Sequence, residues 1–189
     1  MGKGKRRTIG TIITMTTITV LLIILYYNLS NRTSPSEENV NEVEVLLNKD
    51  LELYYPATPK EVVRLYSNML EHLYSDLEDD EIKALAIKIR ELYDDELLEN
   101  NPMDEYMNNL ISEIAEWKAS ERKITNYVFI KDKDNLTSTI DGKEYTTIHV
   151  SYTFEEKKKF LEVWRFLLRR DNNNHWKILG WNHVPQTEE

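Results

Sequence analysis

The spacing of apolar residues changes once along this chain, from a helical period to a strand period, near residue 122. Before that point, three stretches place apolar residues three and four positions apart, as an amphipathic helix does. After it, the pattern repeats every two residues, as in a strand with one buried face. A chain ordered in this way is expected to fold as an α+β domain, with its helices packed on one face of an antiparallel sheet.

Each of the three helical stretches has a recognisable start. The first combines Thr58 with Pro59 and Glu61, which predicts a capping box and a helix over 59–75. The second helix is expected to follow an acidic cap and to reach about residue 93, and the third is expected to follow a proline and to reach about residue 117. The residues that mark these two starts are Asp79 or Asp80, and Asn101 with Pro102.

Four strands are predicted after residue 122, at 124–130, 144–154, 159–169 and 175–182. Asp141 and Gly142 form the residue pair that best suits a two-residue hairpin turn. The links between later strands are short, so neighbouring strands must run antiparallel, because a parallel return needs a crossover of about a dozen residues or more. The predicted domain is therefore three helices followed by a four-stranded antiparallel meander.

Residues 8–27 form a run of twenty residues without a charge. A helix of that length rises about 30 Å, which is the thickness of the hydrocarbon core of a bilayer. Basic residues flank the run on its N-terminal side alone, which predicts a cytoplasmic N-terminus; they are Lys3, Lys5, Arg6 and Arg7. We therefore expect a single-pass transmembrane helix, with a buried helix of a soluble protein as the alternative.

These features divide the chain into four expected parts. They are a basic cytoplasmic tail at 1–7, the transmembrane helix at 8–27, a polar tether at 28–50 and the α+β domain at 51–189. The tether is polar and has no sustained period, although 41–47 could form a short strand or a helical turn against the domain. The predicted localisation is the cell membrane, with the C-terminal domain extracytoplasmic.

Composition argues against several classes of function. After residue 27 the chain holds all 33 acidic residues and 20 of the 24 basic ones, a net charge of −13, which disfavours nucleic acid as a partner. The lack of cysteine excludes disulfides, thiol catalysis and thiolate metal sites. Only Gly142 and Gly180 follow residue 27, so phosphate-binding loops of the P-loop or Rossmann kind are excluded. No cofactor, metal site or catalytic residue is therefore expected.

Three segments resemble a known family; they are YPATPKEVV at 55–63, LYDDELLENNP at 92–102 and WKILGW at 176–181. Together they resemble an uncharacterised family of bacterial membrane-anchored exported proteins. That family looks like the nuclear-transport-factor-2-like cone, a fold shared by ketosteroid isomerases and scytalone dehydratase. The resemblance spans about 51–184 and departs from the commonest cone order, because no strand is evident between the helices.

The resemblance implies that any pocket lies between the helices and the sheet of the cone. The candidate lining residues are Tyr66, His72, Tyr93, Tyr106 and Trp117, together with His149 and Trp164. Aromatic residues at core spacing usually serve packing, so a structural role stands beside the binding role for each. His72 lies near Glu71 and Asp76, where a general acid or base could be built, and helix-boundary polarity explains it as well. His149 is expected on the solvated face of its strand.

The function that these features favour is a non-catalytic protein-interaction or assembly module. The alternative is a small-molecule-binding or isomerase-type enzyme that uses the cone cavity, and a subunit of an export or conjugation machine is a third hypothesis by analogy of fold. Strand 159–169 carries apolar groups on both faces, which predicts association through the sheet, as a homodimer or with an envelope protein partner. Alternatively, the segment before Leu51 folds back over the sheet with Val43, Val45 and Leu47 as its apolar side.

Overall fold

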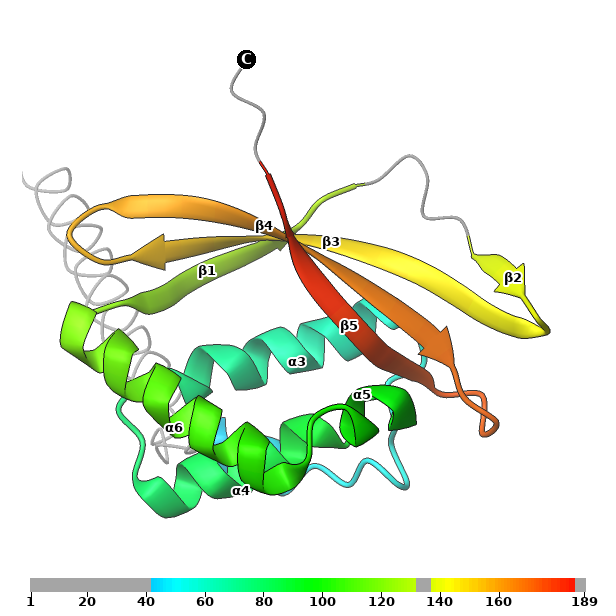
Figure 1. The fold of residues 1–189 in the computed structure, drawn as a ribbon, viewed down its shortest axis with the longest axis horizontal. Coiled ribbons are helices and arrows are strands. Elements are labelled where there is room, and N and C mark those ends of the chain that lie inside the picture. The colour runs from blue at the N-terminus through cyan, green and yellow to red at the C-terminus, as the bar shows by residue number, and fades with distance from the viewer. Residues whose placement is uncertain (1–41, 132–136, 186–189) are drawn as a thin grey trace, which may run out of the picture. The chain divides into compact units, whose positions relative to one another are not determined.

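The computed structural model describes residues 42–131 and 137–185, in which five helices precede five strands (Figure 1). The helices are α2 (Glu42–Leu47), α3 (Pro59–Leu73), α4 (Asp79–Arg90), α5 (Asp95–Glu99) and α6 (Met103–Ser120). The strands are β1 (Lys123–Phe129), β2 (Ser138–Ile140), β3 (Lys143–Glu155), β4 (Lys159–Arg170) and β5 (Trp176–Val184). Figure 1 shows α3, α4, α5 and α6 on the same side of a twisted sheet, so the domain has two layers.

The sheet is antiparallel, with strand order β1-β3-β4-β5, and β2 also pairs with β3. β1 lies opposite residues 150–155 of β3, and β2 lies opposite residues 143–145, so the two short strands follow one another along the same edge of β3 (Figure 1). Asp141 and Gly142 form the turn between β2 and β3 with φ values of 50° and 76°. Two successive positive φ values are typical of the tight hairpin turn predicted at this pair.

The helix starts follow the expected chemistry at α3 and differ from it at the other two sites. The Thr58 hydroxyl accepts from the Glu61 amide at 3.2 Å, and the Glu61 carboxylate accepts from the Thr58 amide at 3.0 Å, which confirms the capping box. At α4 the cap is Glu78, one residue before the expected aspartates, and its amide donates to the Glu81 carboxylate at 3.2 Å. At α6 the cap residue is Pro102, which has no side-chain oxygen to accept a bond.

The core lies between α3 and the inner face of the sheet, meaning the face that the helices cover. Every second residue of β3 is buried there, namely Thr146, Ile148, Val150, Tyr152 and Phe154. Tyr66 on α3 packs edge-on against Phe166 on β4, with ring centroids 5.3 Å apart. The Ser67 hydroxyl bonds the Tyr152 hydroxyl at 2.5 Å and so joins α3 to the middle strand inside the core.

The expected fold class is wrong in two respects. First, the described residues form five helices and five strands, and not the three helices and four strands expected. The sequence did not predict α2, α5 and β2 as separate elements, because they are only six, five and three residues long and too short to produce a periodic pattern. Second, no helix within the described ranges is long and apolar enough to cross a membrane. The longest of them, α6, carries charged side chains along its 18 residues. The predicted segment 8–27, the tail before it and residues 28–41 lie outside the described residues.

α2 occupies the last part of the segment expected to be a tether. It forms the helical turn that the sequence allowed, and it packs on α3 and α4 with Val43 buried and Val45 exposed. α2 therefore covers part of the helical layer, and the prediction that this segment folds back over the sheet is wrong for its described residues. The side of the sheet opposite the helices, which we name the outer face, receives no cover from it.

A short backbone connection links the helical layer to the last strand. Tyr93 and Ile178 form an isolated parallel bridge, in which the Asp94 amide donates to the Ile178 carbonyl at 2.9 Å and the Ile178 amide donates to the Leu92 carbonyl at 2.8 Å. The segment between α4 and α5 thus adds one strand-like residue to the edge of β5, where the sequence shows no strand pattern.

Candidate functional site

Three of the predicted cavity residues, Tyr66, Tyr93 and Tyr106, line one pocket, which we name the tyrosine pocket. Its volume is about 150 Å³, and its walls come from α3, α4, α6, the bridge segment and β5. The other lining residues are Leu70, Leu73, Tyr74, Ile89, Asn101, Asn109, Leu110, Glu113 and Trp181. The pocket therefore lies between the helices and the sheet, which is where the resemblance implied a cavity.

Aromatic rings form much of the pocket wall. The ring centroid of Tyr93 lies 6.3 Å from that of Tyr66 and 6.4 Å from that of Tyr106. Trp181 lies 5.5 Å from Tyr66 and 5.8 Å from Tyr93. An aromatic ring has an electron-rich face and an electron-poor edge, so this wall is largely apolar but still carries local partial charges.

The prediction from sequence did not include Trp181, and a β-bulge explains why. Strict alternation from the buried Ile178 would place Trp181 on the outer face of the sheet. The register shifts between Leu167 and Leu168, so Trp181 pairs with the inward-facing Phe166 and points toward the helices. The signal for this shift is Gly180, since a glycine inside a strand often marks a bulge.

The polar groups of the pocket lie close enough to influence one another. The Tyr93 hydroxyl interacts with those of Tyr66 and Tyr106, and the Tyr74 hydroxyl interacts with the Glu113 carboxylate. Burial raises the pKa of Tyr66, Tyr74 and Tyr93 above its ordinary value, because a phenolate is poorly solvated there. The hydroxyls therefore stay neutral at physiological pH, and Glu113 is the one charged side chain among the described residues that line the pocket.

A cation already lies against one of these rings. The Arg90 guanidinium is 4.9 Å from the ring centroid of Tyr106, which is the geometry of a cation–π contact. Its Nη1 atom is buried without a hydrogen-bond partner among the described residues. Arg90 is not one of the lining residues of the pocket, so it approaches Tyr106 from outside the pocket.

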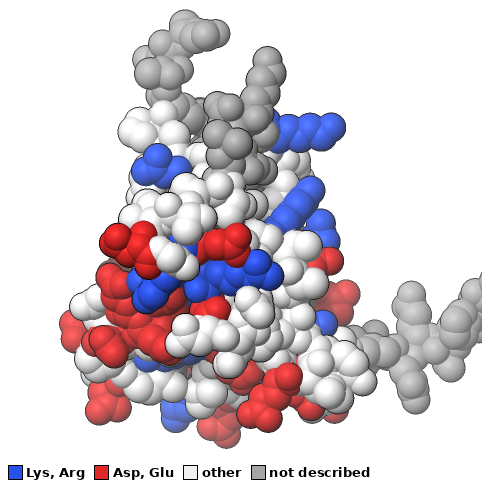
Figure 2. Space-filling model, turned by 90° about the vertical axis from the view of Figure 1, so that its right-hand side faces the viewer, with Lys and Arg blue, Asp and Glu red and all other residues white. Residues whose placement is uncertain are grey.

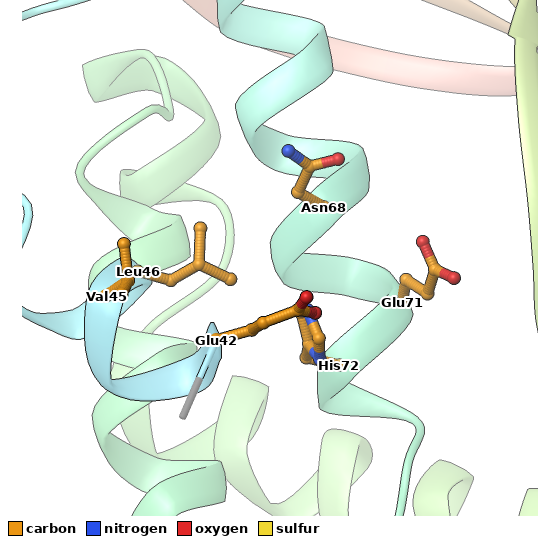
Figure 3. A pocket seen from close by; sticks show the side chains of 6 residues that line it. All are labelled: Glu42, Val45, Leu46, Asn68, Glu71 and His72. Atoms are coloured by element: carbon orange, nitrogen blue, oxygen red, sulfur yellow. The ribbon is translucent and has the colours of Figure 1, made fainter. Parts of the chain in front are cut away.

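His72 and Trp117 lie outside the tyrosine pocket. His72 faces a shallow pocket of about 360 Å³ between α2 and α3, where its Nε2 atom is 3.4 Å from the Glu42 carboxylate (Figure 3). Trp117 stacks on Tyr74 with ring centroids 3.8 Å apart and is 7% exposed, so it fills the core between α6 and α3. Both residues also border a neighbouring pocket of about 680 Å³. The structure therefore separates the five predicted residues into three that line the tyrosine pocket and two that lie outside it.

The two further candidates on the sheet lie on opposite faces. Trp164 is buried on the inner face, where it contacts Tyr152 with ring centroids 4.9 Å apart. His149 lies opposite Arg165 on the neighbouring strand and shares the outer face with it. Neither residue lines the tyrosine pocket.

The outer face of the sheet carries exposed apolar side chains, 38–56% accessible, which are Val128, Ile130, Ile140, Leu161 and Leu167. Arg165 lies among them and donates from Nε to the Asn182 side-chain oxygen at 3.1 Å. Glu155 is the only acidic residue at an outward position of the described strands. Its carboxylate lies 3.6 Å from the Lys159 ammonium and so neutralises that charge. The outer face thus combines apolar groups with unneutralised positive charge.

Charge is divided unevenly between the two layers. Residues 42–120, which contain the helices, hold 20 acidic and seven basic residues, a net charge of −13. Residues 123–184, which contain the strands, hold eight acidic and 11 basic residues, a net charge of +3. Figure 2 shows the same division from one side: acidic side chains gather on the lower, helical part, and the upper part is mainly uncharged with scattered Lys and Arg.

Comparison with known proteins places the chain in a family. No curated protein was found to match it. A family model described as a domain of unknown function (DUF6715) matches residues 1–181, which include the tyrosine pocket and most of the sheet. Because the match covers nearly the whole sequence, the chain belongs to the DUF6715 family.

Proposed function

We propose that this domain is a protein-interaction module that binds a different protein through the outer face of its sheet. The observation that carries the proposal is the set of exposed apolar side chains on the same face as Arg165, which no described helix or loop covers. Exposed apolar side chains that gather on one sheet face among polar and charged groups are typical of interaction sites.

The charge of the outer face favours a partner with an acidic, partly apolar surface. A second copy that packed face to face would bring the exposed Arg165 toward its own equivalent, and like charges oppose such a contact. Carboxylates on a partner would instead complement Arg165. A homodimer is therefore the less favoured occupant, and the experiment below distinguishes the two.

The tyrosine pocket supports a non-catalytic reading of the domain. Its tyrosine hydroxyls remain protonated and His72 lies outside it, so Glu113 is the one group among its described lining residues that could act as a general base, and no second acid–base side chain is paired with it. We further propose that the two layers form a cone of the nuclear-transport-factor-2-like kind. Helices on one face of a twisted antiparallel sheet support this proposal, as does the bridge at Tyr93, which stands where the cone order has a strand.

Site-specific photo-crosslinking in cells that express the full chain tests the interaction. A photoreactive residue is placed at Leu161 or Leu167 on the outer face, and at Ile87 or Ile111 on the helical layer as matched controls, both 51% exposed. We expect adducts with one other protein from the outer-face positions only. Arg165→Glu should reduce their yield about fivefold or more, the effect of roughly 1 kcal/mol of binding energy, whereas Arg165→Lys should retain it.

Two results would overturn the proposal. Adducts of twice the mass of the chain would identify a second copy as the occupant of the outer face. Equal yields from the helical positions, or no adduct from Leu161 and Leu167, would show that the outer face is not an interface.

A further inference from the structure

We infer that the tyrosine pocket binds a small organic ammonium ion, with the rings of Tyr66, Tyr93 and Trp181 around the cation and Glu113 as its counter-charge. This inference is independent of the interaction through the outer face, since the pocket opens on the helical side of the sheet.

The volume of the pocket limits the ligand. About 150 Å³ is the size of a cavity that holds one benzene molecule, and it is well below the volume of most drug-sized sites. The ligand is therefore restricted to about five to eight non-hydrogen atoms. A tetraalkylammonium group with methyl substituents meets this limit.

The wall chemistry selects a cation over an anion or a neutral apolar molecule. Aromatic rings attract a cation through their negative faces, most strongly in the case of tryptophan. Glu113 is the one charged side chain among the described residues that line the pocket, and its carboxylate lies close enough to the Tyr74 hydroxyl to interact with it. Arg90 on the ring of Tyr106 shows that this aromatic cluster already accommodates one guanidinium ion.

The charge of the surrounding layer acts in the same direction. The segment that holds the helices carries a net charge of −13, which raises the local concentration of cations and repels anions. Because the Arg90 guanidinium stands at Tyr106, the ligand is expected toward the other end of the cluster, between Trp181 and Glu113.

Calorimetric titration of the full chain tests the inference, with tetramethylammonium chloride as the probe and tert-butanol as a neutral control of the same size. Salt is held constant throughout. We expect tetramethylammonium to bind with a dissociation constant of about 1 mM, since a few cation–π contacts and one carboxylate supply roughly 4 kcal/mol. Tert-butanol should bind at least about tenfold more weakly, since it carries no charge to attract the rings or the carboxylate.

Two pairs of variants locate the site. Glu113→Gln should weaken binding of tetramethylammonium by about tenfold, whereas Glu116→Gln, on the same helix and outside the lining residues, should leave it unchanged. Trp181→Leu should weaken binding, whereas Trp181→Phe should retain most of it, because phenylalanine keeps an aromatic face. Circular dichroism confirms that each variant is folded.

Three results would overturn the inference. One is the absence of binding by tetramethylammonium up to about 50 mM, far above the expected constant. Another is equal binding of tert-butanol, which would identify a simple apolar cavity. The third is an equal loss from Glu116→Gln, which would show that the cation responds to the overall charge of the layer and not to this pocket.

Discussion

Arg169 and Asp94 form a paired contact that joins β4 to the first turn of α5. Arg169 Nε donates to one oxygen of the Asp94 carboxylate at 2.9 Å, and Nη2 donates to the other. The same carboxylate accepts from the Glu96 amide at 3.0 Å and so caps the helix. The bonds to Asp94 raise the pKa of the Arg169 guanidinium. Asp94, which is only 4% exposed, thus connects the sheet to the helical layer.

Replacement of Asp94 by alanine should lower the free energy of unfolding by about 3 kcal/mol or more. The change removes a helix cap, which contributes about 1 kcal/mol, and leaves the largely buried Arg169 without its main counter-charge. Urea denaturation measures the loss. Glu99→Ala, at an exposed position of the same helix, is the control and should stay within about 0.5 kcal/mol of the native chain. Equal losses for the two variants would mean that the ion pair adds nothing to stability.

The Ser67–Tyr152 bond should show coupling in a double-mutant cycle. Tyr152→Phe removes one hydroxyl and should cost about 1 kcal/mol, since the Ser67 hydroxyl still donates to the Val63 carbonyl at 2.8 Å. Ser67→Ala should cost a similar amount. The free energy of unfolding that the double variant loses should be smaller than the sum of the two single losses, by at least about 0.5 kcal/mol. Simple additivity would contradict the bond.

Stability should fall steeply above pH 10. Burial raises the pKa of Tyr66, Tyr93 and Tyr152 above the ordinary value of about 10. Above pH 10 the unfolded chain therefore loses protons that the folded chain keeps, and each such tyrosine lowers the free energy of unfolding by up to about 1.4 kcal/mol per pH unit. Denaturation at pH 9, 10 and 11 measures the slope.

A matched variant isolates the contribution of one hydroxyl to that slope. Tyr93→Phe keeps the ring and removes the ionisable group, so its unfolding free energy should fall less steeply above pH 10 by up to about 1.4 kcal/mol per pH unit. A slope identical to that of the native chain would show that Tyr93 ionises equally well in the folded and unfolded states.

The two glycines of the sheet should respond differently to alanine. Gly142 has a φ of 76°, which an alanine adopts at a cost of about 1 kcal/mol or more. Gly180 has an ordinary φ, and a Cβ atom there would meet no atom within 4 Å. Thermal unfolding of Gly142→Ala should therefore show a lowered midpoint, while Gly180→Ala should change it little. A larger loss at Gly180 would mean that the bulge itself requires glycine.

The sequence was sufficient to predict the long, periodic elements. The helix that starts at Pro59 and the two long central strands carry enough repeats to define which face is buried. The turn at Asp141 and Gly142 was predicted because few other residue pairs tolerate two positive φ values. In each case the residues whose pattern predicts the element lie within that element.

The features that the sequence did not predict depend on contacts between distant segments. The bridge at Tyr93 consists of backbone bonds to one residue of β5, which leave no side-chain pattern. Trp181 faces the helices because of a bulge, and strict alternation gives the opposite face. Tyr66, Tyr93 and Tyr106 were selected by residue type from three separate segments, and the same choice of residues also included Trp117, which fills the core.

The bridge between Tyr93 and Ile178 has a consequence for the order in which the chain folds. Ile178 follows Tyr93 by 85 positions, so the ribosome completes every helix of the domain well before it delivers the partner of this segment. Until then the amide of Asp94 and the carbonyl of Leu92 must be hydrated, and the tyrosine pocket lacks the wall that Trp181 supplies. Contacts this far apart in sequence are costly to close and form slowly. The native structure therefore cannot be completed before the final strand is made, and loss of that strand would leave the helical layer without the backbone partner of Asp94 and without one wall of the tyrosine pocket.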